Sequence, residues 1–413
     1  MSVQMIDLKI MVNALDLLSH KHSHQNSKSH CVLVINVWPS PLNYVGHVLF
    51  FAGMSKSVLL YSIAVQVLFI LSPQICHVIY MYRARNNVKD FADEFYVSLS
   101  SIVVVFKDFS LMKNFDVVKG MIDTMDMKMM QPKGDMQKRK FHGIMGTWKR
   151  IYWTYTTICI TFVIMQLASP AIDRLLNGSK LLPLVDCYPF DIYTSPVYEV
   201  MYLYQTCVLF CLVLHNYNVD TFITGMLYFA SAQCDILCDN LSSIKLKRVE
   251  RNVEIDKAEL TKELTSNIKH HQEIFRFIRQ LEQVFSLNIF EQYSCSLITF
   301  CTTMFKFSLT EPFTQEFFTI IFYQTSVFLQ MFAFCWAGTL LTSKSEKIST
   351  AAYQSDWIGA SKAYKKNLII FIKRSYRPLV YRTFIFGLSL DLFVSLLRSS
   401  FSYYTVLTAL NEK

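Results

Sequence analysis

The stretch Ile348–Leu410 reads ISTAAYQSDWIGASKAYKKNLIIFIKRSYRPLVYRTFIFGLSLDLFVSLLRSSFSYYTVLTAL. It begins with a basic segment, is interrupted at Pro378, and ends in an apolar run long enough to cross a bilayer. Two charged residues, Asp391 and Arg398, lie within this run, where a bilayer makes a charge costly. Charges kept at such a depth indicate a functional role.

The polar residues of this last run fall on one side of a helix, because residues three and four apart share a helical face. The stripe consists of Asp391, Ser395, Arg398, Ser402, Thr405 and Ala409. The other sides are mainly Leu, Phe and Tyr. The pattern predicts a helix that lines a water-filled pore or cavity. Packing of the small and hydroxylic residues against a neighbouring helix is the alternative.

The composition is that of a membrane protein. The 413 residues are 52% hydrophobic and only 17% charged, whereas soluble proteins carry about 25% charged residues. The first residues are interrupted by Asp7, Lys9 and Asp16, so they do not resemble a cleavable signal. We therefore expect an all-α polytopic membrane protein with a cytosolic N-terminus.

Hydropathy predicts seven membrane-spanning helices. Their expected positions are about 57–82, 91–112, 151–171, 198–230, 293–309, 316–341 and 384–410. The fourth, fifth and sixth helical patterns continue past bilayer thickness, which predicts helices that extend into the cytosol.

The loop charges predict the orientation of these spans. The loops after the second, fourth and sixth spans carry 10, 8 and 9 Lys and Arg residues, while those after the first, third and fifth carry 3, 2 and 1. Basic loops remain in the cytosol. The C-terminus should therefore be extracellular, and the sequon at Asn177 falls in an external loop where glycosylation is possible.

These expectations divide the chain into six regions. They are a cytosolic tail with a membrane-surface segment (1–56), the first four spans (57–238), a cytosolic helical extension (239–292), the fifth and sixth spans (293–342), a cytosolic anchor segment (343–382) and the last helix with the C-terminus (383–413). The pair His270–His271 lies in a charged part of the extension and is expected on a solvated face.

The chain carries no recognisable catalytic, phosphate-binding or zinc-binding motif. We therefore expect no enzyme activity, no cofactor and no metal, and the His-rich run at 20–24 is interpreted as a solvated tail. The net charge of +9 is explained by cytosolic loops beside anionic membrane lipid rather than by nucleic-acid binding.

Three pieces of the C-terminal third resemble the insect odorant receptor family. They are AAYQSDW (Ala351–Trp357), KRSYRP (Lys373–Pro378), and the final helix with SLDLF (Ser389–Phe393) and SSFSYYTVLTAL (Ser399–Leu410). The layout upstream is also similar, including Trp38-Pro39 and a lysine late in the second span, Lys107. The short loop at about 240–275 resembles the odorant-tuned subunits rather than the longer shared co-receptor.

This resemblance implies a non-selective cation channel of four subunits, opened by an odorant and assembled with the co-receptor. The protein would lie in the plasma membrane of olfactory sensory neurons. Cytosolic helix ends would anchor the tetramer, and each final helix would line one central pore. The resemblance implies these pore and gate residues: Asp391, Arg398, Ser402, Thr405, Val406, Ala409 and Leu410. Val406 is the expected gate.

The resemblance also implies an odorant pocket in the outer half of the second, third, fourth and sixth helices. The expected ligand-binding residues are Phe91, Phe95, Tyr96, Leu99, Phe162, Val163, Gln166, Met201, Tyr202, Gln205, Phe317, Ile320, Tyr323 and Gln324. This aromatic and neutral set suits a small uncharged volatile such as an ester, alcohol or terpenoid. Plain core packing is the alternative, and it is the more common reason for an aromatic residue at helical spacing.

A seven-helix receptor that signals through G proteins is the alternative function. It requires the opposite orientation, which the loop charges disfavour. A transporter is also disfavoured, because the chain shows no internal repeat.

Overall fold

The computed structural model describes residues 66–85, 88–178, 180–184, 188, 191–245 and 253–411. All of them belong to one compact unit, Ser40–Lys413. The described part of the chain is helical apart from turns and one isolated bridge between Arg382 and Gly387. The expectation of an all-α protein is therefore confirmed.

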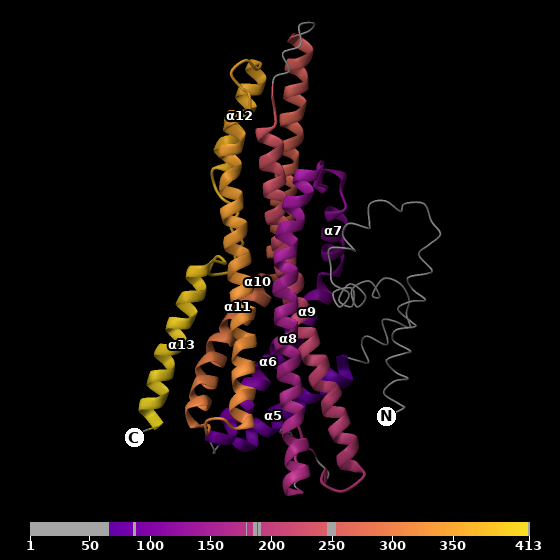
Figure 1. The fold of residues 1–413 in the computed structure, drawn as a ribbon, viewed down its shortest axis with the longest axis vertical. Coiled ribbons are helices and arrows are strands. Elements are labelled where there is room, and N and C mark those ends of the chain that lie inside the picture. Colours follow the sequence, from indigo (N-terminus) through magenta and orange to yellow (C-terminus); the bar gives the residue numbers. More distant parts are fainter. Residues whose placement is uncertain are drawn as a thin grey trace, which may run out of the picture. The chain divides into compact units, whose positions relative to one another are not determined.

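The helices follow one another in the order shown in Figure 1. Their bounds are η1 Gln66–Leu71, α5 Ser72–Ala84, α6 Val88–Lys113, α7 Phe115–Met125, η2 Lys128–Met130, α8 Asp135–Asn177, α9 Val197–Ser242, α10 Val253–Leu309, α11 Gln315–Tyr353, α12 Lys362–Ser375 and α13 Leu390–Asn411.

Four long helices, α8 to α11, form the body of the bundle. They contain 43, 46, 57 and 39 residues, whereas about 20 are enough to cross a bilayer. Helices α8, α9 and α11 combine this length with the apolar composition of a membrane span. The extension of the fourth, fifth and sixth helical patterns beyond bilayer thickness is thus observed, while the number of seven spans stays a prediction.

Helix α9 packs against both α8 and α11, and α10 packs against α6, α9 and α13. In Figure 1 the C-terminal end of α9 and the N-terminal end of α10 lie towards the same end of the bundle as α12. The C-terminal ends of α8, α10 and α13 lie towards the opposite end. Helices that alternate in direction in this way fit the expected sidedness of the loops, and which end faces the cytosol stays a prediction.

The last helix begins at Leu390, not at Phe384 as the hydropathy suggested. The intervening residues form a tight turn, in which Thr383 N–H donates to Phe386 O at 2.8 Å and Leu388 N–H donates to Tyr381 O at 3.0 Å. Apolar composition alone does not distinguish such a turn from the first turns of a helix.

This turn is fixed to the long helices at both ends. Leu379 N–H donates to Ser345 Oγ of α11 at 2.9 Å, and Arg382 N–H donates to Glu282 Oε1 of α10 at 2.8 Å. Leu390 N–H, at the start of α13, donates to Thr339 Oγ1 of α11 at 3.0 Å. The position of α13 therefore depends on α10 and α11.

The expectation that His270 and His271 lie on a solvated face is wrong. They are 3% and 5% exposed. His270 Nε2 lies 3.1 Å from Gln233 Oε1 of α9, and the His271 ring meets the Phe371 ring of α12 edge to face at 5.3 Å. Burial lowers the pKa of both imidazoles to about 4. The charged residues around this pair in the sequence did not predict its exposure, because α9 and α12 cover this face of α10.

Candidate functional site

A partly enclosed cavity of about 100 Å³ lies inside the bundle. Helices α6, α8, α9, α10 and α11 contribute its walls, together with Leu184 from the α8–α9 connection. The apolar part of the lining consists of Val103, Val104, Phe162, Leu184, Leu209, Leu212, Val213 and Val327. Most of these residues belong to the main hydrophobic core, so the cavity is a gap within the core rather than a surface groove.

One wall of the cavity is aromatic and hydroxylic. Phe162 of α8 and Tyr323 of α11 pack with ring centroids 5.3 Å apart. The Tyr323 hydroxyl lies 2.6 Å from Ser100 Oγ of α6. Three helices are thereby joined at the cavity surface, and a ligand here would meet a ring face and two hydroxyl groups.

A buried ion pair lies beside the polar end of the cavity. Lys107 Nζ of α6 is 2.5 Å from Asp220 Oδ1 of α9, and both side chains are almost fully buried. Lys107 also donates to Asn216 Oδ1 at 2.6 Å, and Gln330 Nε2 of α11 donates to Asp220 Oδ2. Gln292 Nε2 of α10 donates to Gln330 Oε1 at 3.0 Å. Each charge thus has several partners, as buried charges require.

A second polar pair joins the same two helices, through the residue after Lys107 on α6 and a residue five positions before Asp220 on α9. His215 Nε2 is 3.3 Å from Asp108 Oδ1, and Asp108 is 7% exposed. Helices α6 and α9 are therefore held by two adjacent polar pairs at this depth.

The α8–α9 connection closes the opposite end of the cavity. Leu184, which lines the cavity, donates its N–H to Gln205 Oε1 at 2.9 Å. Gln166 Nε2 donates to Pro183 O at 2.8 Å, and the Tyr198 hydroxyl donates to Leu181 O at 2.8 Å. We call residues 181–184 the roof, because three side chains of α8 and α9 hold this segment over the cavity.

Three of the residues expected to bind ligand line the cavity: Phe162, Gln166 and Tyr323. Gln205 does not line it but holds the roof. The cavity therefore lies deeper than the expected pocket. It uses Ser100–Val104 of α6 where we expected 91–99, and Leu209–Asn216 of α9 where we expected 201–205.

The other expected residues surround the cavity without lining it. Val163, Met201 and Ile320 are buried in the core. The Tyr202 hydroxyl donates to Leu167 O at 2.7 Å, which leaves it engaged with α8.

Nearer the outer ends of the helices, Phe317 stacks on Phe307 at 4.9 Å and Gln324 accepts from Thr303. Phe95 and Leu99 are half-buried, and the side chains of Phe91 and Tyr96 are outside the described part of the chain. A ligand-binding role for any of these residues stays a prediction.

The sequence reading missed Asp220 and the whole contribution of α10. A signal for Asp220 was present, since an acidic residue well inside a predicted span indicates a functional site with a basic partner. Lys107, late in the second span, is that partner. Gln292 gave no comparable signal, because it lies at the predicted start of the fifth span, where a polar residue is ordinary.

The polar stripe of α13 faces away from its own chain. Asp391, Ser395, Arg398, Ser402 and Thr405 are exposed. The opposite side carries the buried residues Phe393, Leu396 and Ser400, and it packs against α10 and α11. Packing of these five residues against another helix is therefore excluded within the part of the chain that the structure describes.

The expected gate, Val406, is 54% exposed and lies one residue beyond Thr405 of the stripe. The side chains of Ala409, Leu410 and Asn177 are outside the described part, so their expected roles at the pore and at the glycan remain predictions.

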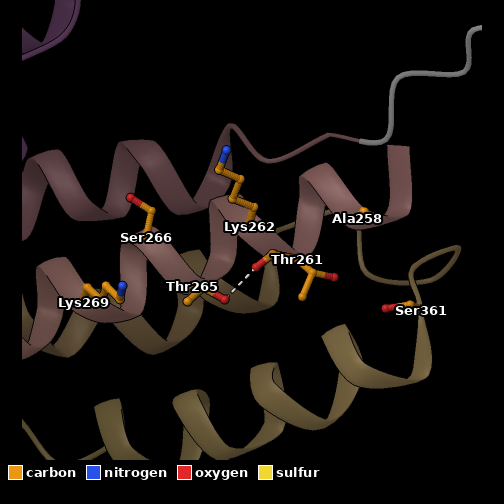
Figure 2. Close-up of a pocket in the computed structure, with 7 residues that line it drawn as sticks. All are labelled: Ala258, Thr261, Lys262, Thr265, Ser266, Lys269 and Ser361. Carbon is orange, nitrogen blue, oxygen red and sulfur yellow. Dashed lines mark hydrogen bonds between the residues drawn. The ribbon is translucent and has the colours of Figure 1, made fainter. Parts of the chain in front are cut away.

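A second, open groove of about 820 Å³ lies near the N-terminal end of α10 (Figure 2). Its lining is Ala258, Thr261, Lys262, Thr265, Ser266, Lys269 and Ser361. Its side chains carry hydroxyl and ammonium groups, and Ser361 is already engaged in capping α12 by accepting from Tyr364 N–H at 3.1 Å. The groove is open along its length and would leave much of a small ligand uncovered, so the internal cavity is the better candidate.

Long apolar helices, an internal cavity and an exposed polar stripe on the last helix are together typical of a helical membrane protein with a small-molecule site. The family model described as 7tm Odorant receptor matches residues 87–401. The chain belongs to this insect odorant receptor family, whose members are receptors rather than enzymes.

Curated relatives agree with this assignment. Odorant receptor Or1 of Anopheles gambiae is 20% identical over 358 residues, which cover 80% of this chain and 84% of the relative. Odorant receptor 46a, isoform A, of Drosophila melanogaster is 24% identical over 220 residues, which cover 53% of this chain. That match spans only 56% of the Drosophila protein.

Solved structures share the fold. The olfactory receptor OR5 of Machilis hrabei superposes with a TM-score of 0.75 at 17% identity, covering 86% of this chain and 89% of that one. The structure of OR5 in complex with eugenol gives a TM-score of 0.78 at 16% identity, covering 89% of this chain and 97% of that one.

Proposed function

We propose that this chain is the odorant-binding subunit of a ligand-gated, non-selective cation channel. It binds a small neutral hydrophobic volatile in the cavity and opens a central pore, which it forms with the odorant co-receptor in a heterotetramer. Its place is the plasma membrane of olfactory sensory neurons, with seven spans and an extracellular C-terminus. Family membership supports the receptor part of this proposal.

The observation that carries the proposal is the position of α11 between the cavity and α13. Tyr323 and Val327 of α11 line the cavity. Phe328 and Phe332, on other sides of the same turns, contact the Phe393 ring of α13 at 5.0 and 5.7 Å. A ligand that displaces α11 will therefore also change the packing of α13.

The size of the cavity supports this coupling. A cavity of about 150 Å³ holds a molecule as small as benzene, so 100 Å³ is too little for an odorant of ten carbons. Binding must enlarge the space, and a packed core is enlarged by moving helices or side chains. The ligand then favours the expanded arrangement because it binds that arrangement better.

The chemistry of the lining supports a neutral volatile. Rings, aliphatic side chains and hydroxyl groups surround the cavity, and the charges of Lys107 and Asp220 neutralise each other. OR5 of Machilis hrabei, which has the same fold, is known in complex with eugenol, a ligand of the neutral aromatic kind that such a lining accommodates.

The exposed stripe of α13 supports a pore role. Four subunits that turn this face towards a common axis would surround it with hydroxyl groups, Asp391 and Arg398. The long cytosolic parts of α10 and α11, with α12 folded beside them, supply the anchor that would hold the tetramer, and the basic groove of Figure 2 is on this part.

The test is whole-cell current during a panel of volatiles, in cells that express this chain with and without the co-receptor while G-protein signalling is blocked. We expect a fast cation current only in the co-expressing cells. A response that disappears under the G-protein block, at confirmed surface expression, would instead support the seven-helix G-protein receptor.

A cavity-filling variant locates the binding site. Leu212→Phe adds volume to a residue that lines the cavity and should abolish the current. Leu203→Phe is the matched control, because Leu203 is on the same helix but 57% exposed. Equal loss in both variants would contradict binding in this cavity.

A further inference from the structure

Gln292 of α10, a residue of the cavity lining, carries a buried hydrogen-bond acceptor that is unused. The side chain lines the cavity and is 7% exposed. Its Oε1 has no hydrogen-bond partner among the described residues. A buried acceptor left unmade is costly, so it is a place where a ligand gains more than packing.

The buried ion pair fixes which atom of Gln292 is the free one. The Asp220 carboxylate only accepts, so Gln330 must turn its Nε2 towards Asp220 Oδ2. Gln330 Oε1 is then the atom that receives a hydrogen bond, and Gln292 must turn its Nε2 towards it, at 3.0 Å. Gln292 Nε2 is also 3.2 Å from Ser296 Oγ, so both of its hydrogens are used. Only Oε1 remains, and an amide oxygen cannot donate.

Asn216 offers the complementary group nearby in the lining. Its Oδ1 accepts from the Lys107 ammonium at 2.6 Å, and an ammonium only donates. The Oδ1 atom of Asn216 is therefore occupied, and its N–H₂ group is the part of the amide that can bind a ligand. The polar end of the cavity thus combines one acceptor with one donor. Two further amides line the cavity, and their N–H₂ groups are engaged, that of Gln166 with Pro183 O and that of Gln330 with Asp220. The remaining lining is mainly apolar, aromatic or hydroxylic.

We infer that the cavity selects odorants with a hydroxyl group, such as an aliphatic or terpenoid alcohol or a phenol, through a hydrogen bond from that hydroxyl to Gln292 Oε1. This inference rests on the proposed function and narrows its ligand class. A hydroxyl donates to Gln292 and accepts from Asn216, whereas an ester, ether or ketone only accepts and a hydrocarbon does neither. Every ligand without a donor leaves Gln292 Oε1 unpaired in a drier cavity.

The test compares matched ligands on the receptor co-expressed with the co-receptor. Each alcohol is paired with its O-methyl ether and with the hydrocarbon that carries methyl in place of hydroxyl, so that shape and volume stay close. We expect the alcohols to reach half-maximal current at about tenfold lower concentration, the size of one buried hydrogen bond left unmade.

Two variants assign the preference to its atom. Gln292→Met keeps the length of the side chain and removes the acceptor, and it should bring the alcohol and its ether to within about twofold of each other. Leu287→Met is the control on the same helix, because Leu287 is 47% exposed, does not line the cavity and leaves Gln292 with all of its partners. It should keep the tenfold preference.

Three outcomes separate this inference from the function on which it rests. If ethers and hydrocarbons activate the receptor as well as alcohols do, the hydroxyl preference is overturned. If Leu212→Phe still abolishes the current in that case, the odorant-gated channel is unaffected. A preference that survives in Gln292→Met at normal surface expression also overturns the role of Gln292. Absence of any volatile-evoked current overturns both.

Discussion

Gly338 of α11 and Leu388, two residues before α13, approach each other so closely that no side chain fits between them. A Cβ atom at position 338 would lie 2.4 Å from Leu388 Cβ and 2.6 Å from Leu388 O. Leu388 is 1% exposed and its N–H is bonded to Tyr381 O, so it cannot withdraw without opening the turn. Glycine is therefore required here for the contact between α11 and the turn that leads into α13.

The change Gly338→Ala should impair the receptor through this contact. Even one methyl group must push the turn away from α11, and overpacking of this kind costs about 1–3 kcal/mol. We expect a lower melting temperature of the purified receptor and an altered fraction of channels open without ligand. Gly120→Ala is the control, since nothing lies within 4 Å of a Cβ there. A normal Gly338→Ala receptor would show that the turn moves freely.

The Lys107–Asp220 pair should be strongly interdependent. Asp220→Leu leaves the Lys107 ammonium buried with Asn216 as its remaining partner, and removing one member of a buried pair costs about 3–5 kcal/mol. We expect poor surface expression of Asp220→Leu and substantial recovery when Lys107→Met is added, measured by surface labelling. If the double variant is no better than the single one, the pair does not account for the loss.

Sequence reasoning predicted the helices well and the cavity only in part. Long apolar segments with helical periodicity identify α8 to α11, because the pattern that marks such a helix is contained in the helix's own residues. The depth of the cavity depends on how five helices pack, and no single helix records it. Phe162, Gln166 and Tyr323 were found because the family resemblance implied a pocket in the outer helix halves and these are polar or aromatic residues there. Gln292 was missed because its role depends on Gln330 and Asp220, which lie on other helices.

The stability of the α9–α10–α12 region should depend on pH. The folded protein holds His270 and His271 with a pKa of about 4 instead of 6.5, so between these values the unfolded chain binds more protons. Stability is therefore complete above pH 6.5 and falls as the pH decreases towards 4. The loss is on the order of 3 kcal/mol for each histidine.

Melting temperatures of the detergent-solubilised receptor between pH 7 and pH 4 measure this effect. His270→Gln is the informative variant. Gln233 Nε2 donates to Met130 O, so its Oε1 accepts from His270 Nε2, and a glutamine at position 270 can donate in the same way without titrating. We expect a flatter pH profile in His270→Gln. An unchanged profile would assign the pH dependence to other groups.

The roof should control how fast a ligand leaves the cavity. Gln205→Leu removes the acceptor of Leu184 N–H, and the loss of one such bond weakens the roof by about 1 kcal/mol. We expect current after odorant washout to decay about fivefold faster. Tyr202→Phe is the control, because its hydroxyl binds Leu167 O of α8 and not the roof. Equal decay in both variants would place the access route elsewhere.

The stripe of α13 should influence which cations pass. If the exposed face of α13 lines the pore, Arg398 brings a positive charge to the path and disfavours divalent cations more than monovalent ones, since the repulsion scales with the ion's charge. Arg398→Gln should therefore raise the permeability of calcium relative to sodium, and Asp391→Asn should lower it. Reversal potentials in solutions of the two cations measure both shifts.

Tyr403→Phe is the control, because Tyr403 is also exposed but lies about 140° around the helix from Arg398. The two charge variants must shift the reversal potential in opposite directions if the stripe faces the ion path, whereas a stripe that faces lipid or another subunit would leave the potential unchanged while the amplitude of the current varies.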